Sequence, residues 1–219
     1  MAELNGPRRA AKSGNGKYMV VFVHGYGADG NDLIGLADPM AEHLPDVVFY
    51  APNAPQLCTG NPMGFQWFPI PWLDGSSEAE ATEGMASAAA LLNAWLDETM
   101  LAEGIDETHT LLVGFSQGTM ISLHIAPRRA APLAGVVGFS GRLLAPETLE
   151  DEAQSHLPIL LIHGDADEVV PLQSLPEAAD ALTKVGYEVF THISKGTGHG
   201  IAPDGLQLAL QFIQQQFEI

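Results

Sequence analysis

The sequence predicts an α/β fold with a mostly parallel central sheet and helices on both of its faces. Short apolar runs alternate with longer segments of helical period along the 219 residues, which is the pattern of repeated strand–helix units. The apolar runs are mostly continuous, as expected for strands that are covered on both sides. The chain is also 46% hydrophobic and 16% charged, a composition that argues against disorder and against a fibrous repeat.

The strands and helices are expected in the following order. Strands are predicted over residues 18–24, 47–51, 110–115, 134–139, 158–163 and 187–194. Between them, apolar residues recur at steps of three and four, as in Met85, Ala88, Leu92, Trp95 and Met100, or in Leu172, Leu175, Ala179, Leu182 and Val185. A closing helix is predicted by the spacing of Leu206, Leu210, Ile213 and Phe217. Each stripe is expected to be the face that packs on the sheet.

No linker or internal repeat divides the chain, so a single domain is expected over residues 18–219. Residues 1–17 hold basic residues and glycines where an export signal would have its apolar segment, which predicts a flexible leader and not a signal peptide. The single Cys58 cannot form an intrachain disulfide. Both observations favour a cytoplasmic location.

Acidic residues dominate the charge of the chain. Its 27 Asp and Glu against 9 Lys and Arg give a formal net charge of −18, which repels phosphate backbones and anionic lipid surfaces. No apolar run approaches the roughly 20 residues that a membrane-spanning helix needs. We therefore expect no nucleic-acid partner and no stable membrane association.

Residues 52–75 interrupt the alternation of strands and helices. This segment carries five prolines and four large rings, namely Phe65, Trp67, Phe68 and Trp72. A segment of about 20 residues without a period inside a compact domain is usually functional or disordered, and the aromatic rings argue against disorder. We expect it to form a wall of a binding site, with a small satellite core under a long loop as the alternative.

A candidate nucleophile follows the strand predicted over 110–115. The segment Gly114-Phe115-Ser116-Gln117-Gly118 stands between this strand and a helix, which is the context of a nucleophile elbow. The pattern alone is weak, because it should occur by chance about 0.1 times in a chain of this composition. Its placement strengthens it, since a sharp turn flanked by glycines exposes the serine oxygen. Cys58 lacks such an elbow and is expected to be a small buried thiol.

Two further loops offer an acid and a base in the chain order that such a serine needs. Asp165 and Asp167 follow the strand predicted over 158–163, and both fit the bare chemistry of the acid. His199 stands between glycines after the last strand. The carboxyl ends of parallel strands share one edge, so Ser116, an acid and His199 can meet there. His24 and His163 each end a strand before a glycine, and we interpret both as structural.

The loop after the first predicted strand reads His24-Gly25-Tyr26-Gly27-Ala28-Asp29-Gly30-Asn31. Its glycines allow a tight turn and a close approach to a ligand, as an oxyanion hole of backbone N–H groups requires. The two donors would be the N–H of Tyr26 and that of Gln117, directly after the serine. The alternative is an ordinary turn into a helix that Asp29 or Asn31 caps.

These motifs together resemble those of the phospholipase/carboxylesterase family of α/β-hydrolases. The likeness runs from about Tyr18 to Phe217 and is carried by His24-Gly25-Tyr26-Gly27, Gly114-Phe115-Ser116-Gln117-Gly118, His163-Gly164-Asp165-Ala166-Asp167 and Gly198-His199. The resemblance implies the α/β-hydrolase fold, with Ser116 as nucleophile, Asp167 as acid, His199 as base and the backbone of Tyr26 and Gln117 as oxyanion donors. It also implies an aromatic element near the acyl site at Gln66-Trp67-Phe68.

Two positions depart from the family pattern and concern the acyl pocket. Tyr26 replaces an aliphatic residue, and Met120 stands where smaller residues are frequent. We therefore expect Trp67, Phe68 and Met120 to contact the substrate in a pocket of altered shape. Dienelactone hydrolases share the fold but are cysteine enzymes, so Ser116 argues against that branch.

The sequence thus predicts a serine carboxylesterase that hydrolyses short- to medium-chain esters through an acyl-enzyme. Its partner would be a small-molecule ester, and the chemistry needs no metal or organic cofactor. A lysophospholipase or an acyl-protein thioesterase remains an alternative, as does a noncatalytic binding module of the same fold. The sequence does not indicate an oligomeric state.

Overall fold

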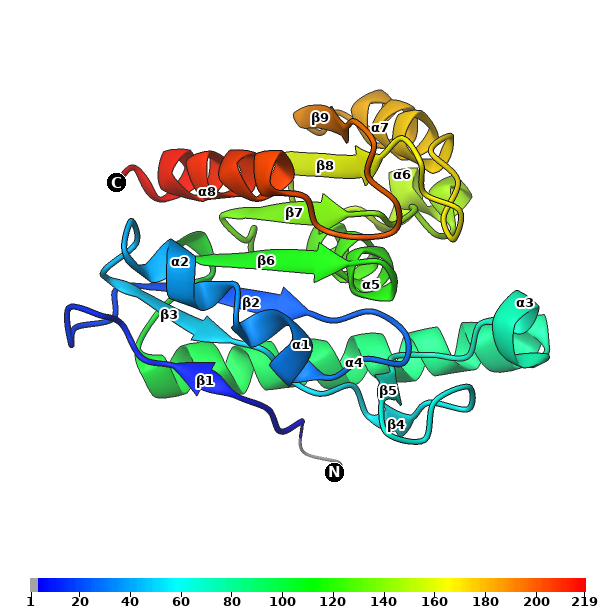
Figure 1. Cartoon of the computed structure of the whole chain (residues 1–219), viewed down its shortest axis with the longest axis horizontal. Helices are drawn as coiled ribbons and strands as arrows, with labels where there is room; N and C mark the ends of the chain where they lie inside the picture. Colours follow the sequence, from blue (N-terminus) through cyan, green and yellow to red (C-terminus); the bar gives the residue numbers. More distant parts are fainter. Residues whose placement is uncertain (1–3) are drawn as a thin grey trace.

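The computed structural model describes residues 4–219, and its centre is a seven-stranded sheet (Figure 1). In spatial order its strands are β1 (Arg8–Arg9), β3 (Val47–Tyr50), β2 (Tyr18–Val23), β6 (Thr110–Phe115), β7 (Gly135–Phe139), β8 (Ile159–Gly164) and β9 (Val189–Ser194). Every neighbouring pair is parallel except β1 and β3, which are antiparallel. The predicted mostly parallel sheet is confirmed, and each predicted strand is present with its ends within two residues.

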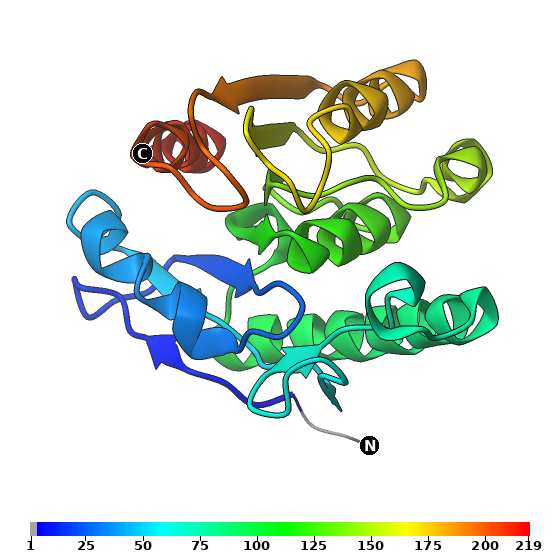
Figure 2. The same cartoon turned by 45° about the vertical axis from the view of Figure 1, so that its right-hand side comes forward.

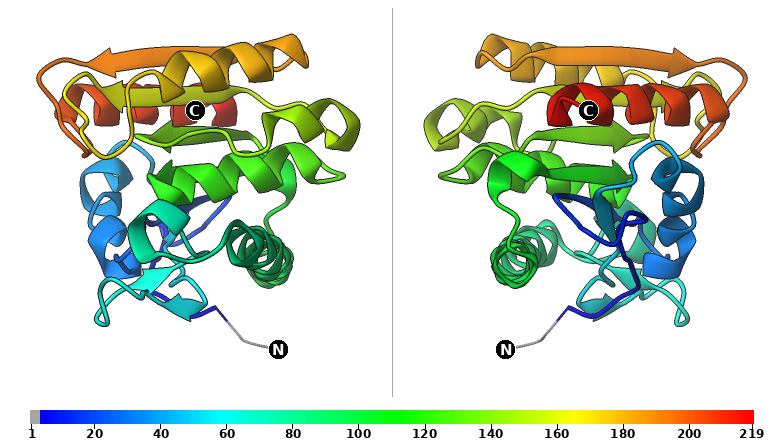
Figure 3. Two further views of the ribbon diagram at one scale, coloured as in Figure 1. Left: turned by 90° about the vertical axis from the view of Figure 1, so that its right-hand side faces the viewer. Right: turned by 90° about the vertical axis from the view of Figure 1, so that its left-hand side faces the viewer.

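Helices cover both faces of this sheet, which confirms the predicted architecture (Figure 3). One face, called here the α8 face, is covered by α1 (Gly30–Ile34), α2 (Ala37–Ala41) and α8 (Pro203–Phe217). The other, called the α4 face, is covered by α4 (Glu78–Glu103), α5 (Gln117–Ile125) and α7 (Ser174–Lys184). Side chains of successive strand residues pack on opposite faces of the sheet: Val20 lies in the core of the α8 face and Val21 in the core of the α4 face. Within residues 4–219, no helix has the length and apolar character to cross a membrane.

Residues 52–75 contain a small hairpin that the sequence does not reveal. The strands β4 (Gln56–Leu57) and β5 (Phe65–Gln66) pair, and the short helix α3 (Pro71–Asp74) follows. The hairpin lies beside the loop after β2 (Figure 2): Phe65 N donates to Ala28 O over 2.8 Å, and Gly27 N donates to Phe65 O over 2.8 Å. A Cβ on Gly64 would stand 2.1 Å from Gly27 O, so only glycine permits this approach.

Residues 4–17 differ from the flexible leader that the sequence predicts, and residues 1–3 of that leader lie outside the described residues. β1 extends the sheet beyond β3, and the side chains of Leu4 and Ala11 are 6% and 8% exposed. Ala51 N also donates to Pro7 O over 3.1 Å. The segment covers an edge of the sheet that would otherwise present unpaired backbone groups. The remaining elements of residues 4–219 are one short helix, α6 (Leu149–Glu152), and three 3₁₀ turns, η1 (Glu107–His109), η2 (Ala126–Arg128) and η3 (Pro146–Thr148).

Candidate active site

Ser116 stands on a strained turn between β6 and α5. Its φ of 53° and ψ of −114° are a backbone conformation that costs on the order of 1–3 kcal/mol for a residue with a side chain. A Cβ on Gly118 would lie 1.8 Å from Val23 O, and one on Gly114 would lie 2.5 Å from Thr119 N. Both glycines of the motif are therefore required by packing, and the turn has the geometry of a nucleophile elbow.

The structure brings Ser116, His199 and Asp167 together in one chain of hydrogen bonds. The Ser116 hydroxyl lies 2.9 Å from His199 Nε2 and donates to it. On the other side of the ring, His199 Nδ1 lies 2.8 Å from Asp167 Oδ2. A carboxylate accepts only, so Nδ1 carries the proton and Nε2 is free to accept the serine proton. This is the arrangement that a serine nucleophile with a general base requires.

Asp167 is held as a carboxylate beside His199. Its side chain has no exposed surface, and its Oδ1 accepts from the N–H groups of Val169 and Val170, both at 2.9 Å. Burial raises the pKa of Asp167, but the hydrogen bonds from His199 and from the two backbone groups outweigh burial and hold that pKa below its usual value.

Asp165, the other acid that the sequence offers, does not contact His199. Its Oδ1 accepts from Gly196 N over 2.6 Å and so joins the loop after β8 to the loop after β9. This bond spans 31 residues, so Asp165 connects two loops and does not form a local turn. Between the two acids, the geometry selects Asp167 as the partner of His199.

The loop after β2 passes directly beside Ser116. A Cβ on Gly25 would lie 3.3 Å from Ser116 Cβ, and Gly27 has a φ of +77°, so glycine suits both positions. Across residues 4–219, no protein group accepts from the backbone N–H of Tyr26 or of Gln117. The Gln117 N–H also opens α5, where the helix favours negative charge. Asp29 caps α1 at the same time, so this loop also serves as a capped turn.

His24 and His163 are structural, as interpreted from the sequence. His24 Nδ1 donates to Gly25 O over 2.8 Å, and its Nε2 accepts from Ala54 N over 2.9 Å. Trp67 Nε1 donates to His24 O over 2.9 Å. His163 Nε2 lies 2.9 Å from Val170 O and donates to it. The two imidazoles thus fix the loops that carry Tyr26 and Asp167.

Low pH is expected to destabilise the folded protein because it favours protonation of His24 in the unfolded chain. Burial lowers the pKa of His24, so the folded protein keeps it neutral at pH values where the unfolded chain, with a pKa of about 6.5, binds a proton. Stability therefore falls as the pH drops below about 6.5. Urea unfolding between about pH 7.5 and pH 5.5 should show a larger loss for the wild type than for His24→Asn. Equal losses in the two proteins would contradict this expectation.

The side chain of Gln117 has a role that the sequence does not reveal. It is fully buried; its Oε1 accepts from Trp67 N over 2.9 Å, and its Nε2 donates to Phe68 O over 2.7 Å. The amide therefore ties the aromatic segment to the first turn of α5. The partners lie about 50 residues apart in sequence, and no local pattern marks such a pair.

Removal of this amide should destabilise the protein. Gln117→Ala leaves a buried N–H and a buried C=O without partners, at a cost of roughly 1–3 kcal/mol for each group. We expect the free energy of unfolding in urea to fall by about 2–5 kcal/mol, while Gln207→Ala on the exposed side of α8 changes it by less than about 0.5 kcal/mol. A loss below about 1 kcal/mol in Gln117→Ala would show that the loop is held by other contacts.

The three residues expected to contact substrate have different positions. Phe68 lines a cavity of about 420 Å³ on the α4 face, called here the α4 cavity. Its wall includes Phe68, Ile70, Trp72, Met85, His124 and Leu144. Trp67 has no exposed surface and Met120 is 2% exposed, and both belong to the core of that face. Their apolar surface is buried against neighbouring side chains, so Trp67 is a core residue, as the alternative interpretation of this segment expects.

Within residues 4–219, no three His, Cys, Asp or Glu residues are grouped so that they could hold a metal ion. The expectation that the chemistry needs no metal or cofactor stays a prediction.

Comparisons with known proteins identify the family of this chain. The family model described as Phospholipase/Carboxylesterase matches residues 5–217. Acyl-protein thioesterase 1 of Saccharomyces cerevisiae is 30% identical and covers 97% of this chain and 98% of its own. Esterase YpfH of Escherichia coli is 26% identical, with 90% and 82% covered. The crystal structure of esterase PE8 is 43% identical, covers 97% and 99%, and superposes with a TM-score of 0.92. The chain therefore belongs to the phospholipase/carboxylesterase family of α/β-hydrolases, enzymes that act on ester bonds.

Proposed function

We propose that the protein is a serine carboxylesterase that hydrolyses short- to medium-chain carboxylic esters through an acyl-enzyme. The hydrogen-bonded chain from Ser116 through His199 to Asp167 is the observation that carries this proposal. A serine hydroxyl is a weak nucleophile until a neighbouring base takes its proton, and the imidazole at 2.9 Å is placed to do so.

Acylation would proceed as follows. Ser116 Oγ attacks the acyl carbon while His199 Nε2 takes its proton, and the charged imidazole is stabilised by Asp167. The oxyanion accepts hydrogen bonds from the backbone N–H groups of Tyr26 and Gln117. As the bond between the acyl carbon and the alcohol oxygen breaks, Nε2 returns the proton to the leaving alcohol.

Deacylation would repeat these steps with water. His199 takes a proton from the water molecule as its oxygen attacks the acyl carbon of the ester on Ser116. The tetrahedral intermediate again faces the N–H groups of Tyr26 and Gln117, and its collapse returns the proton to Ser116 Oγ. The carboxylic acid leaves and the enzyme is restored.

The α4 cavity supports a substrate with an acyl chain of moderate length. Ser116, Met120 and His124 are four residues apart and lie on one side of α5, so the His124 wall is roughly 12 Å along the helix from Ser116. A volume of about 420 Å³ falls in the usual range for a small-molecule site. The name of the yeast relative favours a thioesterase as the second candidate, and the bond type is settled by assay.

The test combines labelling with a chain-length series. A fluorophosphonate probe should label the wild type and Ser87→Ala, whose serine is exposed on α4, but not Ser116→Ala. The labelled proteins should hydrolyse p-nitrophenyl esters with an optimum at short or medium acyl chains, and faster than matched thioesters. A folded wild type that takes no label would support the noncatalytic module instead, and faster thioester cleavage would support the thioesterase.

A further inference from the structure

A second hollow lies on the α8 face and is lined by two neighbours of Ser116, namely Gly25 and Phe115. It has a volume of about 480 Å³ and is called here the α1 groove. Its apolar walls come from three segments: Leu33 and Leu36 of α1 and the turn after it, Phe115 at the end of β6, and Ile201 in the loop before α8. Tyr26 also lines the groove. The α4 cavity lies on the other face of the sheet, where its wall includes His124 of α5. The α1 groove, by contrast, is lined by Gly25 and Phe115, which lie directly beside Ser116.

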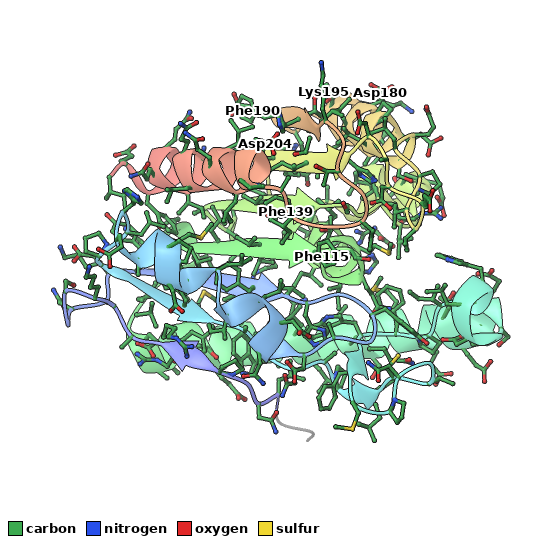
Figure 4. The ribbon with its side chains drawn as sticks, viewed as in Figure 1. Phe115, Phe139, Asp180, Phe190, Lys195 and Asp204 are labelled. Carbon is green, nitrogen blue, oxygen red and sulfur yellow. The ribbon has the colours of Figure 1, made fainter. Side chains whose placement is uncertain are left out.

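The imidazole of His199 reaches Ser116 from the side of the α1 groove. The Phe115 ring lies against the His199 ring, with centroids 5.0 Å apart, and the same phenyl ring lines the groove. Figure 4 shows Phe115 at the carboxyl end of β6. Ile201, two residues after His199, packs with the core of the α8 face and lines the groove as well. The groove therefore lies beside the His199 ring, whose Nε2 contacts Ser116 Oγ.

The chemistry of ester cleavage assigns the two hollows to the two halves of a substrate. The leaving alcohol oxygen must lie within hydrogen-bond reach of Nε2, because that nitrogen returns the proton as the bond breaks. The acyl chain then extends away from His199, toward α5 and the α4 cavity. We propose that the α1 groove binds the alcohol half of the ester, an inference that rests on the proposed esterase function.

The lining of the groove favours neutral, apolar alcohols. Leu33, Leu36, Phe115 and Ile201 offer hydrocarbon surface, and the one carboxylate in the wall, Asp32, accepts a hydrogen bond from Asp29 N over 2.8 Å. With that carboxylate and a net charge of −18, an alcohol that carries its own negative charge is repelled. The groove thus selects against leaving groups that bear phosphate or carboxylate.

The experiment varies one half of the ester at a time. The first series keeps a butyryl group and changes the alcohol from methanol to butanol; the second keeps methanol and lengthens the acyl group. Because kcat/KM reports steps up to release of the alcohol, it isolates the first half-reaction. For the wild type we expect kcat/KM to rise about two- to fourfold per methylene in the alcohol series. A butyryl ester of a carboxylated alcohol should react at least about tenfold more slowly than its neutral counterpart.

Variants in each hollow separate the two halves. Leu36→Trp fills the groove, so kcat/KM should vary by no more than about twofold across the alcohol series and should be unchanged across the acyl series. Leu36→Ala should reduce the same dependence on the alcohol by loss of apolar contact. Thr82→Trp, in the wall of the α4 cavity, should change only the acyl profile. Leu101→Trp, 84% exposed at the far end of α4, is the matched control and should keep both profiles.

Two results would overturn the assignment while leaving the esterase proposal intact. One is a change in acyl preference in Leu36→Trp with no change in alcohol preference, and the other is a wild type that is indifferent to the alcohol. A wild type that hydrolyses none of these esters would instead remove the proposed function itself.

Discussion

Ser116→Ala should abolish ester hydrolysis, with kcat reduced on the order of 10⁵–10⁶-fold. In the proposed mechanism the Ser116 hydroxyl attacks the acyl carbon, and the alanine methyl group cannot form the acyl-enzyme. Because the side chain is small and 8% exposed, the fold should survive the change. Steady-state kinetics on a p-nitrophenyl ester measure the loss, and circular dichroism with urea unfolding verifies that the variant is folded.

A second prediction concerns His199, which accepts the hydrogen bond from Ser116. His199→Ala should lose nearly as much activity as Ser116→Ala, and the double variant should lose little more, because the two groups act as one unit. His192 also pairs with an acid, Asp204 at 2.8 Å, but lies on β9 away from the serine, so His192→Ala should keep kcat within about twofold. Independent, additive losses at Ser116 and His199 would show that the imidazole does not serve the serine.

Much of the fold could be predicted because its signals are local. The strand that ends at Phe115 is mostly apolar, and the apolar stripe on α4 repeats with helical period. β1 and the β4–β5 hairpin have strands of two residues, too short for any period to show. Their stability comes from contacts with β3 and with the loop after β2, which only the folded chain brings together.

The site divides in the same way. Gly114 is required by its close approach to Thr119, and Gly118 by its close approach to Val23 at the end of β2. Both glycines flank Ser116 in the sequence, so the motif can be recognised there without the structure. Whether Asp165 or Asp167 meets His199 depends on how two loops 32 residues apart fold against each other, and here the family resemblance pointed to the acid that the structure also selects. The position of Trp67 could not be predicted from the sequence, because an aromatic ring fits a core as well as a pocket wall and only packing decides between them.

Asp167→Asn should reduce kcat about 10⁴-fold while the loop keeps its shape. The asparagine oxygen can still accept from the N–H groups of Val169 and Val170, which hold Oδ1 now. The amide nitrogen then faces His199 Nδ1, which must accept instead of donate. Nε2 consequently carries the proton and cannot take one from Ser116.

The matched change at Asp165, two residues before Asp167, separates this effect on the His199 tautomer from damage to the loop. Asp165→Asn keeps an oxygen for the Gly196 N–H bond, so we expect kcat to stay within about tenfold of the wild type. Kinetics and urea unfolding of both variants provide the comparison. If Asp167→Asn retains activity similar to Asp165→Asn at equal stability, the carboxylate does not set the tautomer of His199, and the acid must be sought elsewhere. If both variants lose activity and stability together, the loss of activity comes from damage to the loop and not from a change in the tautomer of His199.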